Sequence, residues 1–414
     1  MKSGDPSVVI VGGGIGGLSL ALALHKAGVE CRVYEAAAEI KPLGVGLNLL
    51  PHAVTELDKL GLLDDLLARG IETSDVSFYT AHGQLVYKER RGRLAGYPVP
   101  QISMHRGDLH GVLLDAVRSR LDSNSVVLDR RCRSISQDSS SATACFVDAS
   151  GEVSNASGDI VVGCDGVHSA VRRQLYPNDT AYRFHGTVQY RGVTRWKPFL
   201  SGRSMAYVGT PTTGKLVVYP IREAADPNGH QLLNWVVEVE KDDCGVRDWN
   251  RRASANDFVD LFADWSFDWL DVPAMIRAAD AIYEYPVVDQ DPILQWTTGR
   301  VSLLGDAAHP MLPRGSNGAA QAIIDANTLA GLFARGTDPV SVLKNYEAER
   351  LPATSRVVLV NRDRAPDAIL GVVEARTGGR PFTSLDEVVS QSEIQEWQDA
   401  YKVVAGFSAN QLRT

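Results

Sequence analysis

Hydrophobic positions at the start of the chain follow the order strand, turn, helix, strand. The apolar residues Val8–Val11 run into a glycine turn, Ile15–Ala27 repeats apolar residues at helical spacing, and Cys31–Tyr34 predicts a second strand. Two later segments, Ile160–Val162 and Val301–Leu304, are apolar throughout and each ends at a glycine, which is typical of buried parallel strands. Open α/β sheets bind ligands at the ends of such strands, so we expect the three glycine turns to meet at one site.

The pattern changes between residues 183 and 240, where short segments rich in Val, Tyr and Trp are separated by Thr-Gly and Asn-Gly turns. This chemistry is typical of an antiparallel sheet. The stretch Val76–Val86 predicts two further strands joined at His82-Gly83. The segments expected to form strands in the later region are Val188–Val193, Ser204–Val208, Leu216–Tyr219 and Leu232–Val239.

These patterns together predict an α/β fold in which a Rossmann-like, dinucleotide-binding domain is interrupted by a mainly antiparallel β-sheet domain. We expect residues 1–75, 96–180 and 285–365 to form the first domain, and residues 76–95 and 181–284 to form the second, which would bind substrate. Residues 366–414 are expected to form a C-terminal helical extension.

Composition narrows the possible partners of the chain. The 414 residues carry a formal net charge of −8, which offers no basic field for nucleic acid or an anionic membrane. No segment approaches the roughly 18 uncharged apolar residues of a membrane helix. The cysteines are odd in number and scattered, and the histidines have no metal-binding spacing. We therefore expect a metal-free, soluble, cytoplasmic protein, either a monomer or a homodimer, that acts on a small molecule.

The first glycine turn, residues 12–17, reads Gly-Gly-Gly-Ile-Gly-Gly and fits the pattern G-x-G-x-x-G. Gly12 permits the tight turn, Gly14 lets the backbone approach a pyrophosphate, and Gly17 allows close packing of helix and strand. Glu35 follows the second strand, 21 residues after Gly14, where a carboxylate can accept hydrogen bonds from ribose hydroxyls. It would repel a 2′-phosphate, so the turn suits FAD or NAD. The alternative is that Glu35 is a solvated acid at a strand end.

Two later sequence blocks narrow the class of protein that the first turn indicates. Residues 163–172 read Gly-Cys-Asp-Gly-Val-His-Ser-Ala-Val-Arg, and residues 305–310 read Gly-Asp-Ala-Ala-His-Pro. With the first turn, they resemble the dinucleotide, DG and GD fingerprints of the class A flavoprotein aromatic hydroxylases, which include p-hydroxybenzoate and salicylate hydroxylases. The DG block matches D-G-x-x-S-x-x-R at Asp165, Gly166, Ser169 and Arg172. The resemblance covers residues 8–364, and residues 42–48, 105–109, 191–194 and 262–265 resemble the phenazine-modifying hydroxylases of this group.

The resemblance implies a monooxygenase of secondary metabolism that binds FAD without a covalent link and consumes NAD(P)H and dioxygen. Such an enzyme hydroxylates a planar aromatic molecule, here a phenazine or another polycycle, through a flavin C4a-hydroperoxide. The chemistry belongs to the flavin, so no catalytic side chain is expected. Two alternatives remain: a flavin dehydrogenase or oxidase, and an FAD-binding protein without redox turnover.

The resemblance also implies roles for individual residues. Arg106 and Asp306 should contact the FAD diphosphate and ribityl region, although Asp306 can also cap a helix and Arg106 can be a surface arginine. Asp165 should order the DG turn, and Arg172 either contacts the cofactor or pairs with Asp165. The full set expected to bind FAD is Gly12, Gly14, Ile15, Gly16, Gly17, Glu35, Ala36, Gly46, Arg106, Asp165, Arg172, Asp306, Pro313, Gly315, Gly318 and Ala319.

A pocket for the substrate is expected beside the flavin ring, with walls from the antiparallel sheet. Arg314 lies in the turn that should face the flavin and either anchors a substrate carboxylate or points to solvent. His105 and His309 are expected to be structural. The candidates for the pocket are Gly46, Arg191, Tyr207, Tyr219, Trp235, Pro313 and Arg314, with Val218 as a further wall residue.

Overall fold

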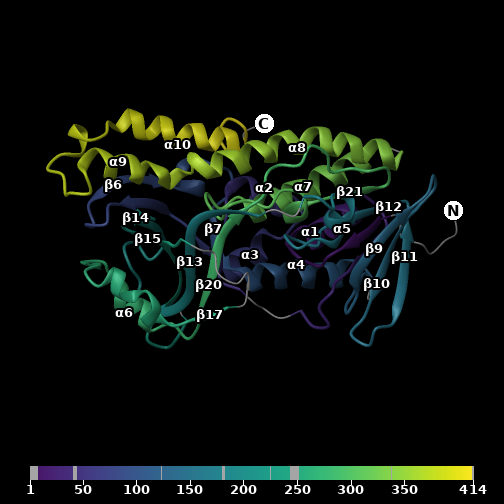
Figure 1. Cartoon of the computed structure of the whole chain (residues 1–414), viewed down its shortest axis with the longest axis horizontal. Coiled ribbons are helices and arrows are strands. Elements are labelled where there is room, and N and C mark those ends of the chain that lie inside the picture. Colours follow the sequence, from purple (N-terminus) through teal and green to yellow (C-terminus); the bar gives the residue numbers. More distant parts are fainter. Residues whose placement is uncertain are drawn as a thin grey trace.

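The computed structural model describes residues 8–40, 44–122, 124–179, 182–223, 225–242, 251–336 and 338–412. Pro42 and Leu43, which belong to one of the stretches typical of phenazine-modifying hydroxylases, lie outside these residues. The molecule is elongated, with a parallel sheet toward one end, a larger sheet toward the other and the long helix α8 (Pro339–Asp363) along one side (Figure 1).

The parallel sheet confirms the strands expected around the glycine turns. Its order is β21-β12-β1-β2-β8, and all neighbouring strands are parallel. Helix α1 packs between α4 and α7, and the whole of β1 is buried, as expected for a strand with no solvated face. The elements are β1 (Val8–Val11), β2 (Cys31–Tyr34), β8 (Val126–Val127), β12 (Ile160–Gly163), β21 (Val301–Leu303), α1 (Ile15–Lys26), α4 (Arg106–Arg120), α5 (Ala170–Leu175) and α7 (Gly318–Phe333).

An antiparallel three-stranded sheet, which the sequence pattern did not reveal, lies beside the parallel sheet. It consists of β9 (Arg131–Gln137), β10 (Ala142–Val147) and β11 (Val153–Gly158). The ring of Phe146 stacks on Tyr34 at the end of β2, with 4.6 Å between ring centroids. The contact joins this small sheet to the nucleotide-binding core.

The second large sheet has the order β17-β20-β13-β16-β15-β14-β5-β6. All neighbouring strands are antiparallel except β14 and β5, which are parallel. The expected strands of residues 76–86 and 183–240 are therefore confirmed as one mainly antiparallel sheet. Its strands are β5 (Asp75–Tyr79), β6 (Leu85–Arg90), β13 (Arg183–Trp196), β14 (Ser204–Thr210), β15 (Gly214–Arg222), β16 (Gln231–Glu240), β17 (Arg252–Ala253) and β20 (Ile282–Asp289).

Short elements connect and cover the two large sheets. A three-stranded sheet of order β3-β7-β4 packs against β15 and so bridges them. Helix α6 covers one face of the antiparallel sheet through β13. These elements are β3 (Gly46–Leu49), β4 (Ile71–Glu72), β7 (Ile102–His105), β18 (Ser266–Phe267), β19 (Leu270–Asp271), α2 (Pro51–Lys59), α3 (Leu63–Arg69) and α6 (Val272–Arg277).

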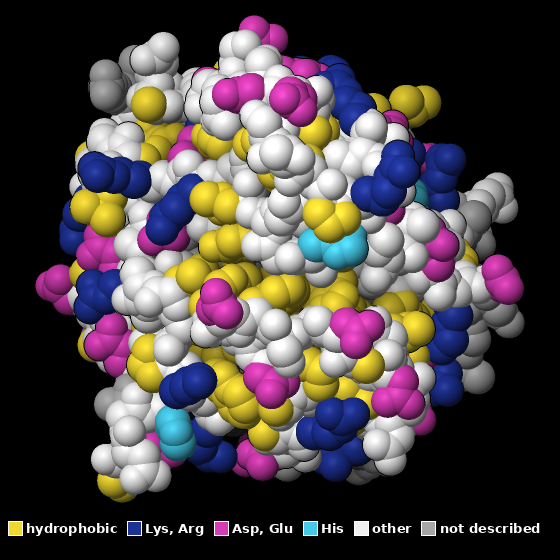
Figure 2. All heavy atoms as spheres, turned by 90° about the vertical axis from the view of Figure 1, so that its left-hand side faces the viewer, with side chains coloured by type: hydrophobic (Ala, Val, Ile, Leu, Met, Phe, Trp, Pro, Cys, Tyr) yellow, Lys and Arg dark blue, Asp and Glu magenta, His cyan; other side chains and the backbone are white. Residues whose placement is uncertain are grey.

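The C-terminal extension is helical, as expected, and consists of α9 (Ile369–Thr377) and α10 (Gln391–Ala405) after α8. Leu370 and Val373 of α9 join a buried cluster with Val76, Phe78 and Tyr207 of the antiparallel sheet. The extension therefore covers the sheet face opposite to α6. At the end of the molecule formed by the antiparallel sheet and α9, hydrophobic side chains gather in a hollow of the surface (Figure 2).

Within the described ranges, none of the helices has both the length and the apolar character needed to cross a membrane. The four described cysteines form no disulfide.

Candidate functional site

A cavity of about 290 Å³ lies where the parallel sheet, the antiparallel sheet and the C-terminal extension meet. Ile15 at the start of α1 and Arg106 at the start of α4 border it on one side, and Tyr207 and Tyr219 border it on another. The turn from Met311 to Ala319 completes the wall. Segments expected to bind the cofactor and segments expected to bind the substrate therefore meet at this cavity.

The first glycine turn packs tightly against the protein at Gly12, Gly16 and Gly17, but is open at Gly14. A Cβ atom at Gly17 would lie 2.0 Å from the carbonyl oxygen of Gly12. Gly12 has a φ of +106°, and a Cβ there would lie 2.5 Å from the carbonyl oxygen of Cys164. At Gly16 it would lie 2.8 Å from Leu304. At Gly14 the structure has nothing within 4 Å, so the turn leaves free space at the one position where the pyrophosphate was expected.

Glu35 is fixed beside this turn at the end of β2. Its Oε2 accepts a hydrogen bond from the backbone N–H of Gly13 at 2.7 Å, and its Oε1 accepts one from Ala37 at 2.8 Å. Ala36 lies between Glu35 and Ala37 in the sequence. The half-buried carboxylate thus has a defined position rather than that of a freely solvated strand-end acid.

Arg106 and Asp306 both face the cavity. Among the described residues, the Arg106 guanidinium has no carboxylate partner. Asp306 is open to the cavity but lies deep in the molecule, and this desolvation raises the pKa of its carboxyl. Its Oδ1 is 3.9 Å from the Cβ position of Gly318, the first residue of α7. The expected helix cap is not formed, since no side chain caps α7 by a hydrogen bond.

The DG block is held together by Asp165. Its carboxylate accepts hydrogen bonds from Ser169 Oγ at 2.5 Å and from the Ala170 N–H at 2.7 Å, at the start of α5. Burial raises the pKa of Asp165, and these hydrogen bonds oppose the rise. Asp165 therefore fixes the turn that packs under Gly12.

Arg172 is directed away from the cavity. Its guanidinium pairs with Asp179 at 2.6 Å and donates to the carbonyl oxygens of Ala307 and Ala308 at 3.2 and 3.0 Å. The side chain is buried, and it pairs with Asp179 in place of the Asp165 partner considered from sequence. This geometry ties the DG block to the GD block and favours a structural role over cofactor contact.

His309 belongs to a buried network that the sequence did not reveal. Its Nε2 lies 2.6 Å from Asp325 Oδ2, and the other carboxylate oxygen accepts a hydrogen bond from Arg350 Nε at 2.7 Å. The N–H of Gly305 also donates to Asp325. His105 Nδ1 accepts a hydrogen bond from Gly107 at the start of α4. Both histidines thus support turns around the cavity.

The turn before α7 is held in place from the C-terminal extension. Gly315 has a φ of +64°, and a Cβ there would lie 1.8 Å from the hydroxyl of Tyr401 in α10. That hydroxyl accepts a hydrogen bond from Asn317 Nδ2 and donates one to Asn361 Oδ1, both at 2.7 Å. Sequence reasoning missed Tyr401 because it lies far along the chain from the motifs.

Two of the expected wall residues, Trp235 and Val218, do not line the cavity. Tyr207 and Tyr219 line the cavity, with Val217 and Val236. Trp235, however, is fully buried on the opposite face of the sheet, where its Nε1 donates to Thr194 Oγ1 at 2.9 Å. Val218 lies in the same buried cluster, so it is no wall residue either. Alternate residues of a strand point to opposite faces, and the sequence pattern assigned the wrong one.

Charged side chains form another wall of the cavity. Glu238 accepts a hydrogen bond from Arg314 at 3.0 Å and lies 3.5 Å from Lys215 Nζ, which also pairs with Asp367 at 2.5 Å. Burial alone would raise the pKa of Glu238, but Lys215 and Arg314 hold it at about 2. Arg314 therefore neither points to solvent nor stays free for a substrate, since its charge is matched by Glu238.

Arg191 is the cation of this wall without a carboxylate partner among the described residues. Its Nε and Nη2 donate to the neutral Gln189 Oε1 at 3.1 and 2.6 Å, and its guanidinium lies 5.2 Å from the ring centroid of Tyr285. Burial lowers the pKa of Arg191, since the charge is surrounded by protein. Its positive charge is therefore not matched by an ion pair with any of the described carboxylates.

Gly46 and Pro313 also border the cavity, as expected. The Gly46 N–H donates to Asn234 Oδ1 at 2.7 Å, and a Cβ there would lie 2.6 Å from the Asn234 side chain. Glycine is thus required where the bridging sheet packs on β16.

Comparisons with known proteins agree with this geometry. Residues 5–360 match the model of a family described as FAD binding domain. The chain is 41% identical over 366 residues to a phenazine 1,6-dicarboxylic acid hydroxylase of Lysobacter antibioticus, covering 86% of this chain and 89% of that protein. It is 31% identical to a 3-hydroxybenzoate 6-hydroxylase of Polaromonas naphthalenivorans, covering 87% of each.

Among solved structures, the Klebsiella pneumoniae protein HpxO in complex with FAD and uric acid superimposes with a TM-score of 0.77. The two chains are 24% identical, and the match covers 98% of this chain and 96% of that one. This likeness supports the overall fold.

Proposed function

The chain belongs to the FAD-dependent aromatic monooxygenases of the FAD binding domain family, and we propose that its substrate is a planar aromatic carboxylic acid, specifically a phenazine carboxylic acid. Bound FAD would supply the redox chemistry, in which NAD(P)H is the reductant, one oxygen atom of dioxygen is added to the aromatic ring and the other leaves as water. The observation that carries the substrate class is the Arg191 guanidinium, which faces the cavity and has only a neutral partner.

The residues present fit the cofactor. The free space at Gly14 and the N-terminus of α1 suit a pyrophosphate, because unpaired backbone N–H groups and the helix dipole stabilise its charge. Glu35 and Ala36 would bind the ribose, and Arg106 would bind the diphosphate. Asp306, Gly46, Pro313 and Gly315 would border the ribityl chain and the ring, together with Gly318 and Ala319 of α7.

On this assignment, residues 1–75, 96–180 and 285–365 would hold FAD, and residues 76–95 and 181–284 would hold the substrate, except that the end of β20, to Asp289, belongs to the antiparallel sheet. Tyr207, Tyr219, Val217 and Val236 offer an apolar wall to a flat ring, and Arg191 offers the charge that orients its carboxylate. A guanidinium binds a carboxylate through two parallel hydrogen bonds, so it fixes both the position and the angle of the ring. The side chains thus orient the substrate and exclude water.

Replacing Arg191 tests the substrate class. The variant Arg191→Met should weaken binding of phenazine-1-carboxylic acid by about 10- to 100-fold, because a charged hydrogen bond contributes roughly 1.5–3 kcal/mol. Binding of unsubstituted phenazine should be nearly unchanged. Both ligands are titrated against the FAD-loaded proteins, followed by the change in the flavin spectrum.

The matched control is Arg195→Met, four residues along the same strand, where the side chain is exposed and its partner Asp280 is exposed as well. It should leave both affinities unchanged. Equal affinities of wild type and Arg191→Met for the acid would refute the proposed substrate class. Incorporation of oxygen from labelled dioxygen into the product checks the reaction itself.

A further inference from the structure

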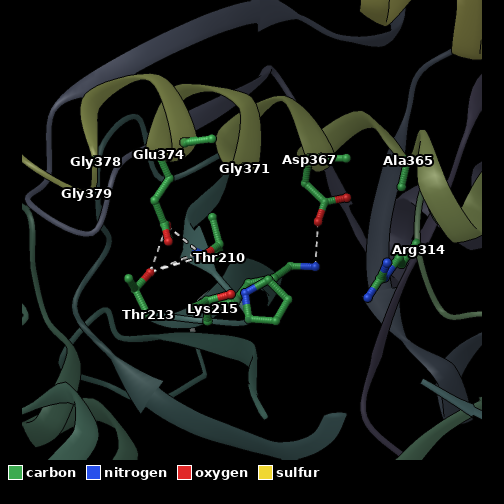
Figure 3. Close-up of a pocket in the computed structure, with 15 residues that line it drawn as sticks. Thr210, Thr213, Lys215, Arg314, Ala365, Asp367, Gly371, Glu374, Gly378 and Gly379 are labelled. Carbon is green, nitrogen blue, oxygen red and sulfur yellow. Dashed lines mark hydrogen bonds and ion pairs between the residues drawn. The ribbon is translucent and has the colours of Figure 1, made fainter. Parts of the chain in front are cut away.

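A second cavity, of about 640 Å³, lies between the β14–β15 turn and helix α9 (Figure 3). We call it the outer cavity, and the cavity of the candidate site the inner cavity. Small residues form much of the wall of the outer cavity, including Gly209 near the end of β14, Pro211 on the turn, and Gly371 and Ala375 on α9. None of the roles assigned so far uses this space.

The two cavities share one wall. Lys215, Arg314 and Asp367 line both of them. Figure 3 shows Lys215 reaching up from β15 to Asp367 at the start of the C-terminal extension, with Arg314 beside them. Lys215 and Asp367 are both buried, and their charged groups are 2.5 Å apart. The Lys215–Asp367 ion pair therefore lies in the wall that the outer and the inner cavity share.

We propose that the outer cavity is the first binding site of the aromatic acid, and that the substrate passes from it to the inner cavity when Lys215 and Asp367 separate. The anionic character of the substrate rests on the proposed function above. The substrate would enter with its carboxylate toward Lys215 at the inner end, where it would take the place of Asp367.

The charges on this wall allow the substrate carboxylate to replace Asp367 beside Lys215. Separating a buried ion pair is costly when it leaves a bare charge, but here the incoming carboxylate replaces Asp367 as the partner of Lys215. Lys215 also keeps Glu238 at 3.5 Å, so its ammonium stays paired throughout. Asp367 lies at the edge of the outer cavity, where water can solvate it once it is released.

The other acid of the outer cavity is held to one side. Glu374 accepts hydrogen bonds from Thr210 Oγ1 at 2.7 Å and Thr213 Oγ1 at 3.2 Å, both on the β14–β15 turn (Figure 3). These contacts fix its carboxylate between the turn and α9. The inner end of the cavity therefore remains the part that attracts an anion.

A side chain that fills the outer cavity tests the route. A Cβ at Gly371 would have nothing within 4 Å, so Gly371→Trp can be accommodated without displacing the core. Phenazine-1-carboxylic acid is mixed with FAD-loaded protein in a stopped-flow instrument. We expect the association and dissociation rate constants both to fall at least tenfold, with Kd within twofold of wild type, because a blocked route leaves its end point unaltered.

Ala375→Trp fills the same cavity from another position and should act in the same way. The control is Ala400→Trp, at an exposed position of α10, which should leave both rate constants unchanged. A stoichiometric FAD content shows that each variant is folded. In Asp367→Asn the ion pair with Lys215 is removed, so both rate constants should rise at least threefold.

Two results would overturn the proposal. Unchanged rate constants in both tryptophan variants would mean that the substrate reaches the inner cavity by another route. A weaker Kd with an unchanged association rate constant would make the outer cavity part of the final binding site. If the wild-type protein does not bind the acid at all, the proposed function fails instead, so the two failures are distinguishable.

Discussion

Gly14 and Gly17 lie three residues apart in one turn, yet a side chain at each would have different consequences. At Gly17, a Cβ would lie 2.0 Å from the backbone oxygen of Gly12, a contact that no rotamer can relieve. Gly14 has an ordinary extended backbone with a φ of −75°, and nothing in the protein lies within 4 Å of its Cβ position. One glycine is thus required by the protein chain itself, and the other by the space that it leaves for a ligand.

The two positions give a paired prediction. Gly14→Val should fold normally but lose FAD, because the branched side chain fills the space above the turn. Gly17→Ala should destabilise the fold by about 3 kcal/mol or more, since overpacking against backbone leaves little room to relax. Flavin content after desalting and urea unfolding of the apoproteins measure the two effects. Stoichiometric FAD in Gly14→Val would show that the pyrophosphate binds elsewhere.

At the scale of elements, the sequence predicted most strands of the two large sheets, but not the small sheet of β9, β10 and β11 or the faces that the strands present. Both faces of the antiparallel sheet are buried, one under the cluster around Trp235 and the other under α9 and the cavity. Polar and apolar residues therefore do not alternate along β15 and β16, and no pattern distinguishes Trp235 from Val236. The glycine turns were predictable because each follows a buried strand whose end is fixed by sheet geometry.

The C-terminal helices show a different limit of the sequence pattern. Residues 366–414 are predicted to be helical, but that prediction does not say which surface they cover. Asp367 and Tyr401 reach the cavity region only because α9 and α10 fold back over the antiparallel sheet. Contacts of this kind depend on tertiary packing between segments that no local motif connects.

Helix α10 should therefore influence the reaction through Tyr401. In Tyr401→Phe, Asn361 and Asn317 each lose a buried hydrogen-bond partner, which should cost about 1–3 kcal/mol of folding stability. The turn from Pro313 to Asn317 borders the inner cavity. Without the hydrogen bonds of Tyr401 this turn is held less firmly, so it should admit water to the cavity. We expect more hydrogen peroxide per NAD(P)H consumed than in wild type, measured with phenazine-1-carboxylic acid as substrate.

The control is Tyr87→Phe. The Tyr87 hydroxyl also joins the antiparallel sheet to α10, through Gln395 at 3.0 Å, but it lies outside both cavities. It should lower stability without changing the peroxide yield. Equal peroxide yields in the two variants would mean that α10 only stabilises the fold.

At the scale of the whole molecule, the inner cavity is assembled from distant parts of the chain. Ile15, Arg106, Arg191, Asp306 and Asp367 all line it, although each comes from a different segment. A ligand that touches several of these segments holds them together, and it stabilises the folded state by binding it in preference to the unfolded chain. The long cofactor required by this family is such a ligand, since one end would lie at Glu35 and the other in the cavity.

We therefore expect FAD to raise the thermal midpoint of the apoprotein, and to do so through both of its ends. At 100 times Kd, a ligand contributes about 2.7 kcal/mol to the stability of the folded state. FMN lacks the adenosine part that Glu35 would bind, so at equal concentration it should raise the midpoint much less. Glu35→Gln should weaken FAD binding by about 1 kcal/mol, because a charged hydrogen bond worth roughly 1.5–3 kcal/mol becomes a neutral one worth roughly 0.5–1.5 kcal/mol. Glu30→Gln, at an exposed position immediately before β2, should leave the FAD effect intact. Thermal melts of the three proteins across a series of FAD and FMN concentrations measure these differences. Identical FAD shifts in wild type and Glu35→Gln would leave Glu35 as a support for the Gly13 backbone, with the ribose bound by other groups.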